Sequence, residues 1–144
     1  MGATATQDTT QEAPRSTKTP PRGTETILLV EDDEVVRRVT RMVLEDLGYR
    51  VLSAEDGPRA AGLSHGFDGD IHMMLSDVMM PGGNGLEWSE RLSRGRPSMR
   101  TLLMSAYTRD GLHREGIALH GAFLLQKPFS AGALALHIRR ILDK

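Results

Sequence analysis

The sequence predicts a doubly wound α/β fold, in which helices cover both faces of a five-stranded parallel sheet. Two observations support this prediction. Short apolar runs alternate along the chain with stretches of helical periodicity, five of each kind. In addition, four of the apolar runs end in polar residues, in the segments LLVEDDE, MMLSDVMMPGGNG, LLMSAY and LLQKPF. Right-handed crossovers then bring the carboxyl ends of all the strands to one edge of the sheet.

The first half of the predicted sheet begins with a strand that is buried on both faces. Residues 27–30 form a continuous apolar run, which is typical of such a strand. Residues 33–47 are predicted to form a helix that ends at Gly48, a suitable C-terminal cap. Its apolar residues are expected on one helical stripe, the side that usually faces the core: Val35, Val36, Val39, Met42, Val43 and Leu47. A second strand at residues 49–53 and an alanine-rich helix at residues 57–63 follow.

The second half of the chain contains the remaining elements. The strands are predicted at residues 71–76, 100–104 and 122–125, and two of the helices at residues 86–92 and 109–119. Gly111 and Gly116 each weaken the latter helix by about 1 kcal/mol relative to alanine. Ser130 is expected to cap the last helix, whose apolar stripe consists of Leu134, Ile138 and Ile141.

Composition narrows the classes of protein that fit the chain. Its 144 residues suit a single domain with a sizeable core, and a net charge of -1 argues against a general nucleic-acid or membrane surface. The absence of cysteine excludes disulfides, thiolate nucleophiles and zinc–thiolate sites. Residues 1–25 contain few large apolar side chains, so we expect a disordered tail followed by a folded domain at residues 26–144. Because the tail has no apolar run, it cannot be a signal peptide or a membrane span, and the cytoplasm is the expected location.

Polar residues follow four of the predicted strands and are expected to meet at one edge of the sheet. They are Glu31 and Asp32, Asp77, Ser105 and Lys127. Two unit charges about 4 Å apart repel by about 4 kcal/mol at an effective dielectric constant near 20, so three crowded carboxylates need a cation. Oxygen ligands favour Mg²⁺, with Mn²⁺ as an alternative. Three carboxylates, a hydroxyl and an ammonium group therefore indicate a site for a divalent cation and a phosphoryl group.

The order and spacing of these segments resemble those of the response-regulator receiver domain of two-component signalling, over about residues 26–144. The stretches MSAYTRD and LQKPF further resemble receivers that are attached to hybrid histidine kinases. The resemblance implies a flavodoxin-like fold with the strand order 2-1-3-4-5. It also implies a signalling domain, in which the surface of the fourth helix, fifth strand and fifth helix changes on phosphorylation.

The resemblance also assigns roles at the sheet edge. Asp77 would be the phosphoacceptor, since a carboxylate can take up a phosphoryl group as an acyl phosphate. Ser105 would donate its hydroxyl to one phosphoryl oxygen, and Lys127 would pair with another. The tight turn that aims Lys127 back at Asp77 also predicts a cis peptide bond before Pro128.

The same resemblance places a metal ion between Glu31, Asp32, Asp77 and the backbone carbonyl of Met79, with Asp32 as the more direct ligand. Phosphoryl transfer depends mainly on positioning and on neutralising charge, so we expect Mg²⁺ to be required. The expected chemistry is Mg²⁺-dependent phosphorylation and dephosphorylation of the chain itself, and the chain is not expected to be an enzyme otherwise.

The switch residues depart from the pattern of the family. Receivers usually carry an aromatic residue three positions before the lysine, and here that position is Leu124. The nearby aromatic, Phe123, is displaced by one residue and therefore points to the opposite face of its strand. Tyr107, two residues after Ser105, is then the aromatic best placed to respond to phosphorylation. We expect the response in residues 105–121.

These expectations describe a single-domain response regulator. It would accept a phosphoryl group on Asp77 from the phosphohistidine of a partner histidine kinase or phosphotransfer protein, and it would signal to a downstream protein rather than to nucleic acid. One alternative is a receiver-like interaction module with little or no phosphorylation. A phosphatase with an aspartate nucleophile is less favoured, because it would have a second acid where Met79 stands. A flavin binder is less favoured still, because acids after the first strand would repel a phosphate.

Overall fold

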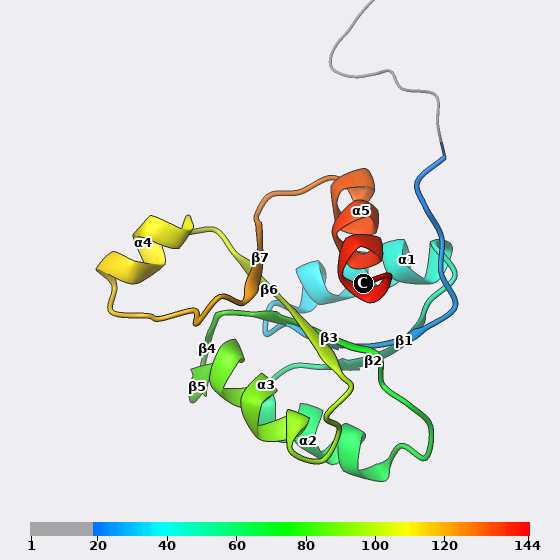
Figure 1. The fold of residues 1–144 in the computed structure, drawn as a ribbon, viewed down its shortest axis with the longest axis horizontal. Coiled ribbons are helices and arrows are strands. Elements are labelled where there is room, and N and C mark those ends of the chain that lie inside the picture. The colour runs from blue at the N-terminus through cyan, green and yellow to red at the C-terminus, as the bar shows by residue number, and fades with distance from the viewer. Residues whose placement is uncertain (1–18) are drawn as a thin grey trace, which may run out of the picture.

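The computed structural model describes residues 19–144, which form a parallel sheet with helices on both faces (Figure 1). Within these residues the main sheet has five strands, in the order β2-β1-β3-β6-β7. They are β1 (Thr26–Val30), β2 (Arg50–Ala54), β3 (Met73–Asp77), β6 (Arg100–Ser105) and β7 (Phe123–Gln126). All neighbouring strands are parallel. The predicted doubly wound sheet and its strand order are therefore confirmed.

The helices form two layers around the sheet (Figure 1). Helices α1 (Glu34–Asp46) and α5 (Ala131–Leu142) cover one face, and α2 (Gly57–Gly66) and α3 (Gly85–Ser93) cover the other. The short α4 (Arg109–Arg114) connects β6 to β7 and lies at the β7 edge of the sheet.

Strand β1 shows why the central strands read as continuous apolar runs. Ile27 and Leu29 point into the core cluster beneath α1 and α5, whereas Leu28 and Val30 point into the cluster beneath α2 and α3. All four side chains are fully buried. Because both faces of the strand are covered, it has no position where a polar residue would reach water.

Helix α1 exposes part of its apolar stripe and buries the rest. Val35, Val39 and Met42 are 70%, 53% and 59% exposed, while Thr40 and Leu44 are buried. The apolar arc of this helix is wider than the strip that contacts the sheet. Helical periodicity therefore identifies the apolar side of the helix, but it does not show which of these residues pack against the sheet.

The helix predicted at residues 109–119 is too long. Helix α4 ends at Arg114, and Gly116 follows with a φ of 81°, a left-handed conformation that glycine adopts without a steric penalty. At the other end of α4, the Thr108 side chain accepts a hydrogen bond from the N–H of Gly111 at 3.0 Å. The chain between α4 and β7 is consequently a loop rather than a further turn of helix.

Three local predictions hold. The Ser130 side chain caps α5 by accepting a hydrogen bond from the N–H of Ala133 at 3.0 Å. Gly48 follows the end of α1 with a φ of 103°. The Lys127–Pro128 peptide bond is cis.

Contacts with the folded domain begin upstream of β1. The N–H of Gly23 donates to the carbonyl of Leu47 at 3.0 Å, and Glu25 pairs with Arg139 at 2.7 Å. Of the tail expected from the sequence, residues 1–18 lie outside the described residues. Within residues 19–144, no helix is long and apolar enough to cross a membrane.

Candidate functional site

The carboxyl ends of the strands carry the residues predicted at the sheet edge. Glu31 and Asp32 follow β1, Asp77 ends β3, Ser105 ends β6 and Lys127 follows β7. Lys127 Nζ lies 2.6 Å from Glu31 Oε1 and 2.6 Å from Asp77 Oδ1. Carboxylate oxygens of Glu31, Asp32 and Asp77 lie within 4.8 Å of one another. The structure therefore joins these three acids and Lys127 in one group, the edge cluster, with Ser105 on the strand next to Asp77.

Burial controls the protonation of the edge cluster. Glu31 and Asp77 are only 1% and 6% exposed. Burial, reinforced by Glu31 and opposed by Lys127, raises the pKa of Asp77 to about 8. Burial would also raise the pKa of Glu31, but hydrogen bonds with Asp77, Lys127 and the N–H of Asp33 lower it. Burial lowers the pKa of Lys127, but the two carboxylates outweigh this and raise it. Near neutral pH, Asp77 therefore keeps a proton beside an ionised Glu31 and a charged Lys127.

The edge cluster fits a hard divalent cation. Its three carboxylates offer oxygen donors within a few ångströms of one another, which is the ligand chemistry of Mg²⁺ and Mn²⁺. A nearby cation favours the ionised form of a carboxyl group, so it would displace the proton on Asp77. Asp32 is exposed at the surface, where a carboxylate can reach both an ion and its water ligands. These residues could hold a metal ion.

A small hairpin supports the backbone just beyond the phosphoacceptor candidate. Strand β4 (Met79–Met80) pairs antiparallel with β5 (Gly83–Asn84), and Asn84 then caps α3 with its side chain. Met79 lies in this hairpin two residues after Asp77. The hairpin thus determines the course of the main chain at the residue whose carbonyl the resemblance implies as a metal ligand.

Ser105 connects the edge cluster to the loop that follows β6. It is 5% exposed, its Oγ accepts a hydrogen bond from the N–H of Tyr107 at 2.9 Å, and its carbonyl accepts one from the N–H of Lys127 at 2.7 Å. Tyr107 itself is 47% exposed. Leu124 packs into the apolar cluster next to α4, whereas Phe123 is 41% exposed. The aromatic side chains of Tyr107 and Phe123 therefore both lie at the surface.

Arg37 of α1 is a site residue that the sequence analysis missed. Its guanidinium donates to the backbone carbonyl of Glu31 at 2.9 Å, and the N–H of Asp33 donates to Glu31 Oε2 at 3.1 Å. Together these bonds hold the turn that carries the acidic pair. An arginine one turn into the helix after such a pair is the signal that could have identified it.

Comparison with known proteins agrees with this geometry. Residues 27–139 match the family model of the response regulator receiver domain. The chain is 32% identical over 122 residues to the sensor kinase CckA of Brucella abortus, covering 85% of this chain and 13% of that protein. It is 28% identical over 116 residues to the response regulator receiver protein CpdR of the same organism, covering 81% of this chain and 95% of that protein.

Solved structures share the fold. The chemotaxis protein CheY4 of Vibrio cholerae superposes with a TM-score of 0.72 at 26% identity, covering 83% of this chain and 100% of that one. The receiver domain of the hybrid histidine kinase CckA gives 0.67 at 30% identity, covering 80% and 96%. The chain spans half or less of the length of the first curated relatives that it matches.

Proposed function

This chain belongs to the response regulator receiver domain family, and from that premise we propose that it accepts a phosphoryl group on Asp77 from the phosphohistidine of a partner histidine kinase or phosphotransfer protein. The family is one of signalling phosphoacceptors rather than conventional enzymes. The expected resemblance to receivers of hybrid histidine kinases is confirmed by the similarity to CckA. The observation that best supports Asp77 is its buried carboxylate, 2.6 Å from Lys127 Nζ and beside two further acids.

Each group at the edge has a part in this transfer. An oxygen of Asp77 attacks phosphorus while the bond to the histidine nitrogen breaks, which gives an acyl phosphate and a histidine that takes up a proton. Lys127 neutralises one phosphoryl oxygen, and the Ser105 hydroxyl donates to another. A bound Mg²⁺ would supply the charge neutralisation on which phosphoryl transfer depends. The groups that would hold the ion are the carboxylates of Glu31, Asp32 and Asp77 and the carbonyl of Met79.

The donor protein is proposed to dock on the apolar face that α1 exposes. Val35, Val39 and Met42 lie on successive turns and are each more than half exposed. The groove beside them is lined by Pro128 and Phe129, which follow the site lysine. Exposed apolar side chains that adjoin one another mark interaction surfaces. A donor protein bound to this face would lie beside the edge cluster, so that its phosphohistidine could reach Asp77.

Output to a downstream protein is proposed to run through the segment after β6. Ser105 would move toward the phosphoryl group, and Tyr107 would move with it because its N–H is bonded to Ser105 Oγ. Helix α4 has only 6 residues, so residues 105–121 can rearrange at low cost. Leu124 in place of an aromatic changes the switch and leaves the phosphoacceptor untouched. A second candidate is an interaction module with little or no phosphorylation.

Beryllofluoride, an analogue of the acyl phosphate, distinguishes the two candidates. When Mg²⁺ and beryllofluoride are added together, the amide NMR signals of residues 105–121 should shift in the wild-type protein. Those of Asp77→Asn should stay unchanged, because the carboxylate that completes the analogue is missing. A wild-type spectrum that does not respond would contradict phosphorylation and support the interaction module.

A further inference from the structure

Strand β3 carries a buried hydroxyl immediately before the phosphoacceptor candidate. Ser76 is 0% exposed in a strand whose preceding residues are all apolar. Burying a hydroxyl is unfavourable unless it is hydrogen-bonded. The Ser76 hydroxyl donates to the backbone carbonyl of Asp77 at 2.9 Å. Met80 Sδ, at 3.8 Å, is the more distant and weaker acceptor.

The carbonyl that Ser76 contacts is enclosed from a second side. A Cβ atom at Gly85 would lie 2.0 Å from the Asp77 carbonyl oxygen and 2.7 Å from Ser76 Oγ, so a side chain there would displace both. On the other side of the same peptide group, the N–H of Val78 donates to the carbonyl of Met104 at 2.9 Å. The peptide group between Asp77 and Val78 is therefore held through its oxygen and through its nitrogen.

The next peptide group, between Val78 and Met79, is held through its oxygen. The N–H of Gly85 donates to the carbonyl of Val78 at 2.8 Å, which closes the segment that contains the β4–β5 hairpin. Met79 follows directly. A side-chain ligand can be changed by substitution, but a carbonyl ligand can be placed only by holding the peptide groups around it.

We propose that Ser76 is a positioning residue that sets the affinity of the site for Mg²⁺, by fixing the main chain between the carboxylate of Asp77 and the carbonyl of Met79. This inference rests on the proposed function. Ser76 does not touch the ion or the phosphoryl group, and it acts through the orientation of the peptide group after Asp77. Its hydroxyl thereby ties two of the groups that would hold the ion into one arrangement.

The test compares two buried serines. Ser76→Ala removes the hydroxyl at the site. Ser89→Ala removes an equivalent one from α3, where Ser89 is 2% exposed and donates to the carbonyl of Leu86 at 2.8 Å. Mg²⁺ affinity is measured by isothermal titration calorimetry on the full chain. We expect Ser76→Ala to bind Mg²⁺ about threefold to tenfold more weakly, which corresponds to one lost hydrogen bond, and Ser89→Ala to bind it like the wild type.

A rate measurement separates positioning from general loss of stability. At saturating Mg²⁺, phosphoryl uptake by Ser76→Ala from a small acyl phosphate should return close to the wild-type rate, because the defect lies in ion affinity. Wild-type Mg²⁺ affinity in Ser76→Ala, or equal weakening in Ser89→Ala, would overturn the inference. If Ser76→Ala does not fold, Ser76→Cys takes its place, because a thiol keeps the shape of the side chain and a weak hydrogen-bond donor. We expect Ser76→Cys to bind Mg²⁺ more weakly than the wild type, by less than the loss expected for Ser76→Ala. A Mg²⁺ affinity of Ser76→Cys equal to that of the wild type would then overturn the inference. A wild-type chain that binds no Mg²⁺ would refute the proposed function along with it.

Discussion

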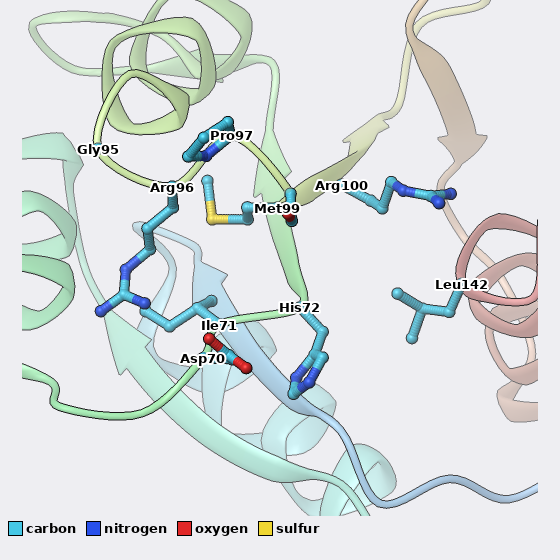
Figure 2. Close-up of a pocket in the computed structure, with 10 residues that line it drawn as sticks. Asp70, Ile71, His72, Gly95, Arg96, Pro97, Met99, Arg100 and Leu142 are labelled. Carbon is cyan, nitrogen blue, oxygen red and sulfur yellow. The ribbon is translucent and has the colours of Figure 1, made fainter.

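The two ends of the central sheet differ in what their charged side chains contact. At the carboxyl end, Lys127 lies between the buried carboxylates of Glu31 and Asp77. At the amino end, a hollow of about 400 Å³ is lined by residues from the loops before β3 and β6, from the start of β6 and from the end of α5, among them Asp70, His72, Arg96 and Arg100 (Figure 2). Judged by size and polarity alone, this hollow would also qualify as a binding site.

The two arginines and the histidine of the hollow bind the backbone instead. Figure 2 shows the side chains of Arg96 and Arg100 pointing away from each other. Arg100 bonds to a carbonyl at the end of α5, and Arg96 donates to the carbonyls of Ser64, Phe67 and Gly69. His72 Nδ1 accepts a hydrogen bond from the N–H of Thr26 at 3.0 Å. Side chains that are already bonded to the backbone, as those of Arg96, Arg100 and His72 are, stabilise the fold. Crowded carboxylates that hold a displaceable proton favour chemistry instead.

The largest expected difference between the two ends is in phosphorylation. Asp32→Asn should slow phosphoryl uptake at a fixed Mg²⁺ concentration at least about 100-fold, because it removes a carboxylate that would hold the neutralising ion. Asp70→Asn is the matched control, an exposed aspartate at the amino-end hollow, and it should react like the wild type. Uptake is followed as initial rates with a small acyl phosphate donor. Equal rates for Asp32→Asn and the wild type would show that the metal site is wrongly assigned.

Stability, unlike phosphorylation, should depend on the side chains at the amino end of the sheet. Arg96→Ala should lower the free energy of unfolding by about 2–3 kcal/mol, since it leaves several carbonyls without their charged donor. Arg94→Ala, at an exposed position two residues earlier, should change it by less than about 0.5 kcal/mol. Urea denaturation measures both, and the folded Arg96→Ala protein should keep its phosphoryl uptake. If this variant lost uptake while remaining as stable as the wild type, the hollow would have a role in the chemistry.

The pH dependence of stability offers a further separation. The pKa of Asp77 is raised from 3.8 to about 8 in the folded chain, so between these values the unfolded chain ionises this group and the folded chain does not. The stability that the protonated carboxyl provides is complete below about pH 4 and is lost as pH rises toward 8, by at most about 1.4 kcal/mol per pH unit. Asp77→Asn should flatten this decline.

Glu31 acts at the acidic end of that window and below it. The lowered pKa of Glu31 affects stability only below about pH 4.5, and there in the opposite sense, because stability is lost as pH falls. Mg²⁺ should offset the decline above pH 4 by favouring the ionised Asp77. Thermal unfolding of the metal-free protein between pH 5 and pH 8 checks the prediction. A wild-type profile as flat as that of Asp77→Asn would mean that Asp77 is ionised throughout.

The smallest expected effect is on partner recognition. Tyr107→Ala should reduce the gain in affinity for a downstream partner on phosphorylation by about tenfold, which corresponds to about 1.4 kcal/mol. Phosphorylation of Asp77 should be unaffected. Phe123→Ala removes the other exposed aromatic and serves as the control. If the partner affinity of Tyr107→Ala still rises as in the wild type, Tyr107 is not the switch.

The strand ends were predictable because their signal is local. A strand buried on both faces reads as a continuous apolar run, and the first polar residue after it marks the carboxyl edge, as at Glu31 and Asp77. The approach of Lys127 to Asp77 was expected, but its second contact, with Glu31, was not, because that contact depends on how three strands align. The β4–β5 hairpin was missed because strands of 2 residues leave no periodic pattern.

Two features could not be read from the sequence, each for a different physical reason. In α1, Val35 and Val39 continue an apolar arc that is wider than the core contact, and hydropathy does not distinguish a core from a docking face. At the amino end, the role of Arg96 could not be read because its partners are backbone carbonyls, which every residue possesses. Ser76 is similar, since its partner is the carbonyl of its neighbour.

The most direct test of the difference between the two ends is to locate the phosphoryl group. Intact-mass spectrometry of the wild-type protein after incubation with Mg²⁺ and a small acyl phosphate should show the addition of a single phosphoryl group, and fragmentation after reduction of the acyl phosphate should place it on Asp77. Asp77→Asn should gain none. A wild-type chain that remains unmodified, or an Asp77→Asn chain that is modified to the same extent, would contradict the assignment of Asp77 as the phosphoacceptor.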